Sequence, residues 1–381
     1  MLIIKRSVSI IVILVSLITS NWCFSQPKTV TLEVTTKLTS QLLSLSITLP
    51  RDYEKNNQQH YPVLYTTASD RRLSVIKEQV DWMSHVSFGP IVPMIIVQLP
   101  YIKLPNEIQN KDVQASGLNT QLTIDILQKS ILPLIETNFR VQPFKILEGY
   151  STNANLPLNI LAQAPALFNA YISINPAWVL DKNQLLEKLG KQLSNENLVT
   201  RTLYVSLGEF SQNNDDFTTF KQLILNSDSD LRVTVDDQRH INYYTAPMVL
   251  FPKALETLFS DMHPKNLTRF IEGGIKSVNQ YYKKLALKYG YPISPVNTLF
   301  DLSNHYSETN NPEKNIAVLR YILTLQPDNI FYHIMLSNSL FTNKQFKAYK
   351  LIIEKAKALA EKSHNQEALE HINHLIIQND S

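Results

Sequence analysis

The stretch FKILEGYSTNANLPL, residues 144–158, contains the strongest local pattern in the chain. A strand-like KIL leads into GYSTN (residues 149–153), and a segment with helical character follows. This order is close to the strand–turn–helix that lifts a nucleophilic serine out of a sheet, whose usual pattern is G-x-S-x-G. Asn153 stands where the second glycine is expected. The stretch therefore predicts either a nucleophile at Ser151 or a turn serine that only hydrogen-bonds locally.

The composition is that of an ordinary globular protein. The 381 residues are 44% hydrophobic and 18% charged, which is enough chain for one large domain and a smaller one. A net charge of +3 gives no reason to expect a nucleic-acid partner. The sequence has no phosphate loop and no cluster with metal-ligand spacing, so we expect neither a cofactor nor a metal.

Residues 1–25 have the pattern of a signal peptide. Lys5 and Arg6 precede an apolar run over 10–18, and Cys23 and Ser25 suit a cleavage site before Gln26. The run is shorter than a membrane span, although an uncleaved anchor or a lipoprotein is the alternative. The sequence therefore predicts an exported protein, periplasmic or secreted from a bacterium, with no membrane span in the mature chain.

Cys23 is the only cysteine in the chain. After cleavage the mature protein would contain none, which excludes disulfides, thiolate metal sites and a cysteine nucleophile.

Residues 26–262 are expected to form an α/β domain with a mostly parallel central sheet. Seven segments have strand patterns, and helical patterns such as 122–139 lie between them. In such sheets the chemistry lies at the carboxyl ends of the strands, where Ser151 and Glu209 are expected. The seven predicted strands lie within 29–36, 42–50, 63–66, 92–100, 145–149, 170–176 and 202–210.

Residues 263–381 are expected to be a helical extension. A 34-residue period aligns 296–329 with 330–363, and the matching positions resemble the large, small and packing residues of tetratricopeptide repeats. Asn315 departs from that pattern, and a generic helical hairpin extension is the alternative. Stacked repeats present binding surfaces, so a protein partner is expected there. The matched pairs are Leu302 and Leu336, Ser303 and Ser337, Tyr306 and Leu340, Leu319 and Ile353, and Ile322 and Ala356.

Ser151, Glu209 and His240 follow one another in the order nucleophile, acid, base. A serine hydroxyl needs a base to take its proton, and a carboxylate usually orients that base. Asp236 and Asp237 are alternative acids because they are close to His240 in the sequence.

Four segments resemble the esterase family of α/β-hydrolases, which includes enterochelin-type siderophore esterases, feruloyl esterases, S-formylglutathione hydrolase and mycolyltransferases. YPVLYTTASD (61–70) resembles the family's YPVLYLLDG, and 131–151 resembles its helix and serine turn. APALFNAYISINPAWVLD (164–181) resembles P-x-L-F-x-x-x-I-x-x-S-P-x-x-W-W. The His240 segment, DDQRHINYYTAPMVLFPKALETLF (236–259), resembles the family's G-x-x-H-x-x-V-x-x-x-x-x-x-x-G-L-x-F-L-F. The resemblance covers roughly 31–259 and implies an α/β-hydrolase fold.

The resemblance also implies roles for single residues. Ser151 and His240 match the nucleophile and the base, and Glu209 matches the acid, although some members work with a Ser–His pair alone. The oxyanion hole would come from the N–H of Thr152 and from the turn at Ser69, where Ala68-Ser69 replaces the family's Asp-Gly. Two further expectations are that Trp178 lines the pocket and that 101–112, which departs from the family's arginine-containing stretch, contributes to substrate binding.

Two functions are therefore predicted. The first is an exported serine esterase that hydrolyses a small-molecule ester through an acyl-enzyme. The second is a catalytically impaired hydrolase-fold protein that acts as a binding or scaffold module through its helical repeats.

Overall fold

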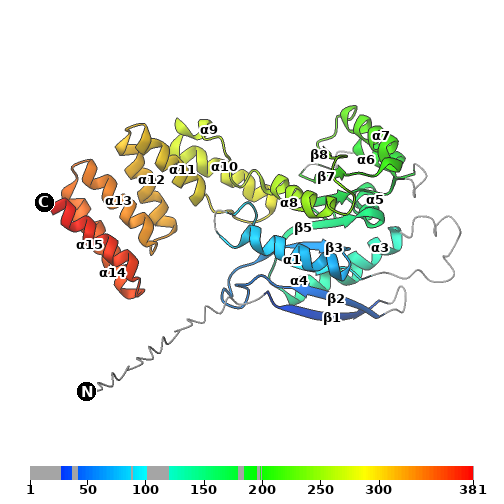
Figure 1. Ribbon diagram of the computed structural model, residues 1–381, viewed down its shortest axis with the longest axis horizontal. Coiled ribbons are helices and arrows are strands. Elements are labelled where there is room, and N and C mark those ends of the chain that lie inside the picture. The colour runs from blue at the N-terminus through cyan, green and yellow to red at the C-terminus, as the bar shows by residue number, and fades with distance from the viewer. Residues whose placement is uncertain are drawn as a thin grey trace, which may run out of the picture.

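The computed structural model of the protein describes residues 27–36, 42–86, 89–100, 120–178, 184–194, 198 and 200–380. Figure 1 shows an elongated molecule with a sheet flanked by helices at one end and an all-helical extension at the other. The predicted fold class, an α/β-hydrolase-like domain followed by a helical extension, is confirmed. The predicted leader, residues 1–25, and the stretch 101–112 lie outside the described residues.

The central sheet has eight strands in the order β1-β2-β4-β3-β5-β6-β7-β8. The strands from β3 to β8 are parallel, whereas β2 is antiparallel to both β1 and β4. The sequence predicts seven of these strands and misses β8, whose side chains are mostly half-buried at the edge of the sheet. The strands are β1 (Thr29–Thr35), β2 (Leu42–Thr48), β3 (Tyr61–Thr66), β4 (Ile95–Gln98), β5 (Val141–Tyr150), β6 (Ala170–Ile174), β7 (Thr202–Leu207) and β8 (Arg232–Asp237).

Helices cover both faces of the sheet, so its central strands are buried apolar runs. On one face lie α1 (Asp70–Ser84) and α8 (Ala246–Phe259). The opposite face packs against α3 (Thr120–Ile126), α4 (Leu132–Asn138), α5 (Asn155–Gln163), α6 (Gln184–Leu193) and α7 (Asn214–Leu225).

The helix predicted over 122–139 contains one widened turn. Its middle, Leu127–Ile131, is a π-helix between α3 and α4. Pro133 lies two residues after its end, and a proline ring crowds the carbonyl four residues before it in a regular α-helix. The wider turn is a local adjustment of the kind that accommodates such crowding.

The extension consists of consecutive helices of which two pairs follow the predicted period. The pairs begin at Val296 and Ile330, and all ten matched positions are buried. The assignment to tetratricopeptide repeats remains a prediction. The helices are α9 (Thr268–Ile271), α10 (Gly274–Tyr289), α11 (Val296–Glu308), α12 (Pro312–Leu325), α13 (Ile330–Thr342), α14 (Phe346–Lys362) and α15 (Gln366–Asp380).

Asn315 departs from the repeat pattern for a visible reason. Its side-chain oxygen accepts a hydrogen bond from Ser303 Oγ (2.6 Å), and its Nδ2 donates to Ser339 Oγ (3.0 Å). Asn315 therefore links α11, α12 and α13 through a buried polar contact, which a small apolar residue could not do.

The extension shares a core with the α/β domain. Tyr289 at the end of α10 packs on Phe144 and Phe259, with ring centroids 4.8 Å and 6.0 Å away. One buried apolar cluster runs from the sheet through α8 and α10 as far as α15. The boundary at 262/263 predicted from the sequence has not been tested.

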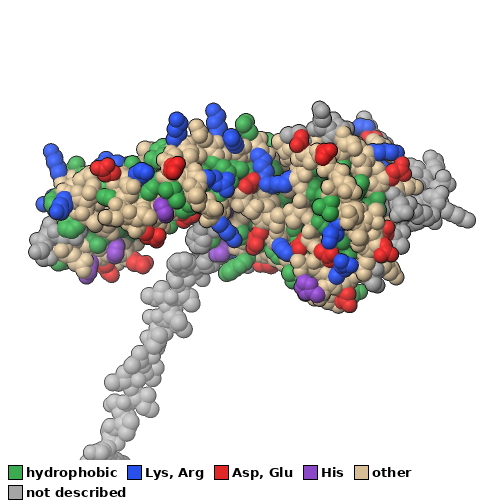
Figure 2. Space-filling view, turned by 90° about the horizontal axis from the view of Figure 1, so that it is seen from above, with side chains coloured by type: hydrophobic (Ala, Val, Ile, Leu, Met, Phe, Trp, Pro, Cys, Tyr) green, Lys and Arg blue, Asp and Glu red, His purple; other side chains and the backbone are tan. Residues whose placement is uncertain are grey.

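The described surface mixes both signs of charge, with Lys and Arg interspersed among Asp and Glu on the face in Figure 2. Among the described helices, none has both the length and the apolar character to span a bilayer.

Candidate active site

Ser151 lies on a sharp turn directly after β5. Its φ is 61°, a left-handed backbone conformation that costs energy for a residue with a side chain. A 3-10 helix, Ser151–Ala154, follows at once and continues into α5. The strand, turn and helix predicted from GYSTN are therefore present, and we call residues 149–153 the elbow.

Gly149 and Asn153 occupy the two glycine positions of the motif, and only one of them needs a glycine. A Cβ at Gly149 would lie 2.2 Å from the carbonyl oxygen of Asn153, so glycine is needed there for close packing. Asn153 itself is not among the residues with positive φ, and its Nδ2 donates to Thr67 O at 3.2 Å. Asn153 can therefore replace the motif's second glycine without backbone strain.

Thr152 and Ser69 were predicted to supply the backbone N–H groups of the oxyanion hole. Thr152 is in the first turn of the 3-10 helix, where N–H groups lack partners within the helix. Ser69 precedes α1, and its N–H has no hydrogen bond recorded among the described residues, whereas the N–H of Ala68 donates to Thr66 Oγ1 (3.0 Å). Because Asn153 bonds to Thr67, the elbow is tied to the turn that carries Ser69.

The side chain that contacts the Ser151 hydroxyl is Tyr243. Its phenol donates a hydrogen bond to Ser151 Oγ. Tyr243 lies in the loop 238–245 between β8 and α8, which also carries His240. His240 is exposed, and no hydrogen bond joins it to Ser151 within the described part of the chain.

The predicted acid is not paired with the predicted base. Glu209 is exposed and its Oε2 accepts a hydrogen bond from Asn242 Nδ2 (3.2 Å). Its backbone N–H donates to Ile241 O (2.7 Å). The loop after β7 therefore contacts the loop that carries His240, although the three side chains do not form a hydrogen-bonded triad.

The alternative acids are engaged elsewhere. Asp236 accepts hydrogen bonds from Lys253, Tyr204 and Gln238; although burial alone raises its pKa, these bonds hold the pKa below its usual value. Asp237 is bound by Arg239 and Lys221, which also lower its pKa.

Trp178, predicted to line the pocket, lies in the core. It is 3% exposed, and its ring packs on Phe220 with centroids 5.3 Å apart. This placement gives its ring no open surface at the elbow.

Tyr243 was missed by the sequence analysis, although the signal was in the family pattern. In G-x-x-H-x-x-V-x-x-x-x-x-x-x-G-L-x-F-L-F the histidine precedes the final phenylalanine by 16 positions. Counted back from Phe259, that position is Tyr243, and His240 falls on the pattern's glycine. The register is supported by the buried Leu255, Leu258 and Phe259 of α8, which take the pattern's apolar positions.

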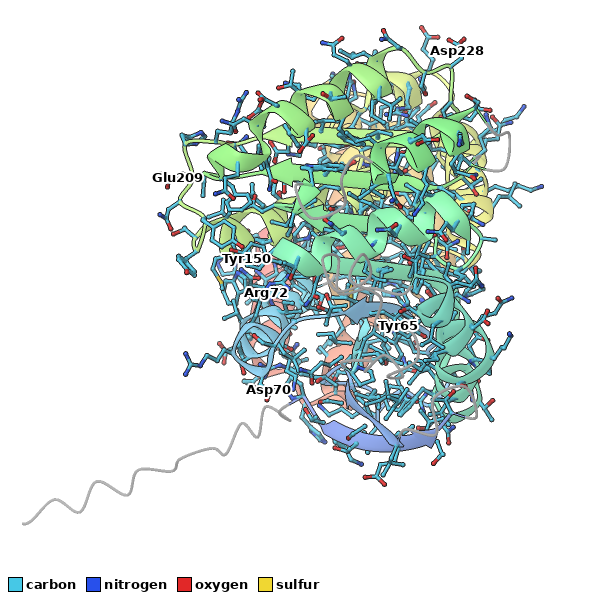
Figure 3. All side chains as sticks on the ribbon, turned by 90° about the vertical axis from the view of Figure 1, so that its right-hand side faces the viewer. Tyr65, Asp70, Arg72, Tyr150, Glu209 and Asp228 are labelled. Carbon is cyan, nitrogen blue, oxygen red and sulfur yellow. The ribbon has the colours of Figure 1, made fainter. Side chains whose placement is uncertain are left out.

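A buried ion pair lies behind the elbow. Glu148 is fully buried next to Gly149, where it accepts hydrogen bonds from Arg72 of α1 and from Thr66 Oγ1 (2.6 Å). The Arg72 guanidinium also lies 5.4 Å from the ring centroid of Tyr150. Figure 3 shows Arg72 and Tyr150 on the same side of the molecule as Glu209.

Within the described residues, no three His, Cys, Asp or Glu side chains gather in a way that could hold a metal ion.

An elbow serine between a strand and a helix, at the carboxyl end of a mostly parallel sheet, is the arrangement typical of serine hydrolases of the α/β type. The family model described as "Putative esterase" matches residues 37–235, more than half of the chain. The protein belongs to this family and is an esterase-type hydrolase. The match ends before the loop 238–245, which carries both His240 and Tyr243.

Solved structures show the same fold. An IroE-like serine hydrolase from Shewanella oneidensis is 15% identical, with a TM-score of 0.60 over 78% of this chain and 100% of that one. An uncharacterised protein from Capnocytophaga ochracea is 14% identical, with a TM-score of 0.63 over 93% of this chain and 99% of that one. The BES protein from Bacillus cereus is 18% identical, with a TM-score of 0.50 over 67% and 98%. A search of curated proteins gives no match.

Proposed function

We propose that the protein hydrolyses small-molecule carboxylic esters through an acyl-enzyme on Ser151. The observation that carries this proposal is the conformation of Ser151, held at φ 61° between β5 and a helix with its hydroxyl at the end of the sheet. A left-handed serine directly between a strand and a helix is the sharp turn that exposes a nucleophile at the end of such a sheet. The N–H groups of Thr152 and Ser69 are proposed to stabilise the oxyanion.

In the reaction, Ser151 Oγ forms a bond to the ester carbonyl carbon while its proton passes to a base on the loop 238–245. The tetrahedral intermediate then breaks its bond to the alcohol oxygen, which takes that proton and leaves. Water next attacks the acyl carbon, gives a proton to the same base and releases the acid, and the base returns the proton to Ser151.

The test is hydrolysis of p-nitrophenyl butyrate by the full chain and by Ser151→Ala. We expect wild type to release p-nitrophenolate and a fluorophosphonate probe to label Ser151, as mapped by peptide mass spectrometry. Ser151→Ala should lose both the activity and the label. Equal rates for the two proteins, or an unlabelled Ser151, would show that the proposal is wrong.

A second candidate is a binding or scaffold protein that uses the helical extension. It is favoured by one observation, namely that the hydroxyl of Ser151 is bonded to a phenol rather than to an imidazole. A protein of this kind would stay inert towards esters and fluorophosphonates at every pH while remaining folded.

We also propose export through the leader at residues 1–25. The expected mature protein begins at Gln26, and N-terminal sequencing of protein from a bacterial periplasm tests this.

A further inference from the structure

Tyr243 occupies the place at Ser151 where a serine hydrolase needs its base. We propose that Tyr243 is the general base of this site, working as its phenolate, and that the enzyme therefore favours esters with good leaving groups such as aryl esters. This inference rests on the proposed function, since it names the residue that takes the proton from Ser151.

The contact between Tyr243 and Ser151 is built from several sides. The Tyr243 ring packs against Tyr150 and Phe210, with centroids 5.3 Å and 5.2 Å away, and Tyr244 meets it edge-on at 5.3 Å. Tyr150 OH donates a hydrogen bond to the backbone oxygen of Tyr243 (2.8 Å). Because Tyr150 is itself the residue before Ser151, the base and the nucleophile are positioned by the same end of β5.

Backbone contacts hold the loop that carries His240 in place. The backbone oxygen of Ile241 accepts from Glu209 N (2.7 Å), and Ile241 N donates to Gln238 O (2.8 Å). Ala246 N donates to Asn242 O (2.8 Å), which fixes the start of α8. Gly208 packs so closely that a Cβ there would lie 3.0 Å from Ile241 O. A shift that brought His240 to Ser151 would break several of these contacts at once.

The acid–base chemistry of a phenol determines which esters can react. In the structure the Tyr243 phenol donates a hydrogen bond to Ser151 Oγ. In this protonation state Tyr243 cannot take the proton of Ser151, so the serine is not activated. Once Tyr243 has lost its proton, the phenolate oxygen can accept the Ser151 proton as the bond between Oγ and the acyl carbon forms. The resulting phenol then returns this proton to the departing alcohol oxygen. An aryl leaving group departs without waiting for that proton, which is why aryl esters are the expected substrates.

The groups around Tyr243 do not include a cation in contact with its hydroxyl among the described residues. Tyr150 faces it from β5, and burial raises the pKa of Tyr150, so that phenol stays neutral. Arg72 lies over Tyr150 but is paired with Glu148. On the loops, Tyr244 and His240 are exposed, and Glu209 bonds to Asn242.

The rate should therefore follow the fraction of phenolate, which rises about tenfold per pH unit below the pKa of any acid. A histidine base instead gives a rate that levels off above about pH 7. The experiment measures pre-steady-state and steady-state release of p-nitrophenolate from p-nitrophenyl butyrate between about pH 6 and pH 9. We expect a rising profile without a plateau near neutrality. We also expect a burst, because the good leaving group speeds acylation but not the later attack of water on the acyl-enzyme.

Tyr243→Phe removes the hydroxyl while keeping the ring that packs on Tyr150 and Phe210. We expect its rate at the alkaline end to fall by about 10²-fold or more. Tyr321→Phe is the matched control because it removes a phenol of α12 in the helical extension, and its rate should equal that of wild type. A fluorinated tyrosine at position 243, which ionises more readily, should move the profile to lower pH; a merely structural hydroxyl would leave the profile in place.

A plateau above about pH 7 would overturn the inference. So would an undiminished rate in Tyr243→Phe, or a loss of activity in His240→Asn with Tyr243 intact. All three outcomes leave the proposed function standing as long as Ser151→Ala is inactive. If Ser151→Ala is as active as wild type, the proposed function and the inference fall together.

Discussion

The elbow shows how a single residue can compensate for a departure from a motif. Asn153 keeps an ordinary backbone conformation and uses its amide to tie the elbow to Thr67. The strain is confined to Ser151, and the close packing is confined to Gly149. Only one of the two motif glycines therefore has a steric reason to be retained here.

Gly149→Ala should damage both stability and activity. The new Cβ would lie 2.2 Å from Asn153 O, a backbone atom that cannot move without displacing the elbow. We expect a loss of about 3 kcal/mol in the free energy of unfolding, measured with urea, and loss of labelling at Ser151. Gly190→Ala in α6 is the control, since its Cβ would meet only the side chain of Leu223 at 3.2 Å. Similar destabilisation by the two variants would contradict the prediction.

Some residues of the site could be predicted from the sequence and others could not. Ser151 was predictable because strand, turn and helix patterns are local and all three surround it. Tyr243 and His240 are three positions apart on one loop, and a motif search selects the histidine because histidine is the usual base. Only the register of α8, fixed by packing against the sheet, decides which of the two reaches Ser151.

At the scale of elements, the joint between β5 and α1 depends on the Arg72–Glu148 pair. Both charges are buried, with Arg72 9% and Glu148 0% exposed, and Thr66 of β3 supplies a further hydrogen bond. Such a pair adds little net stability, but removing one member leaves the other charge buried and alone. The pair therefore fixes the position of the α1 turn, which carries Ser69, relative to the elbow.

Arg72→Met should destabilise the protein by about 3–5 kcal/mol, measured by urea unfolding at neutral pH. Adding Glu148→Leu should recover a large part of that loss because no charge then remains buried. Lys191→Ala, which breaks an exposed pair with Glu187 on α6, is the control and should have no measurable effect. A double variant that is less stable than Arg72→Met would show that burial of an unpaired charge is not the cause.

Helices and strands agree with the predictions where the hydrophobic pattern is strong. They differ from the predictions where packing between elements determines the local structure. The strands β3, β4, β6 and β7 are mostly apolar and buried, and β5 has the apolar segment that leads into the elbow, so these five strand predictions are confirmed. The edge strand β8 has a weak pattern because only part of each side chain is covered, and it was missed. The π-helix before Pro133 could not be predicted, because the choice between a kink and a widened turn depends on packing beneath the sheet.

At the scale of the whole molecule, the extension is joined to the hydrolase domain by charge as well as by the aromatic contacts of Tyr289. Asp261, just after α8, accepts a hydrogen bond from Tyr289 OH (2.5 Å) and pairs with Lys288 of α10 and with Arg232 of β8 (3.2 Å). Burial by itself raises the pKa of Asp261, but the bonds from Lys288 and Tyr289 outweigh burial and hold the pKa below its usual value. Burial also lowers the pKa of Lys288, as expected for an ammonium withdrawn from water.

This arrangement makes part of the stability depend on pH in a defined direction. A carboxyl whose pKa is lower in the folded protein than in the unfolded chain contributes stability that is complete above its unfolded pKa of about 3.9. That contribution is lost as the pH falls through the folded pKa. Asp261→Asn lacks it at every pH and also leaves Lys288 buried without its carboxylate.

We therefore expect Asp261→Asn to be less stable than wild type at neutral pH. The difference should shrink as the pH falls below about 4, because the unfolded wild-type chain takes up a proton at Asp261 before the folded protein does. Urea unfolding of both proteins from about pH 3 to pH 7 measures this difference. Asp230→Asn, a change at an exposed position, is the control and should follow wild type throughout. A difference that stays constant over the whole range would mean that packing, and not the charge of Asp261, holds the extension against the sheet. The shared core through Phe144, Phe259 and Tyr289 would then be sufficient on its own.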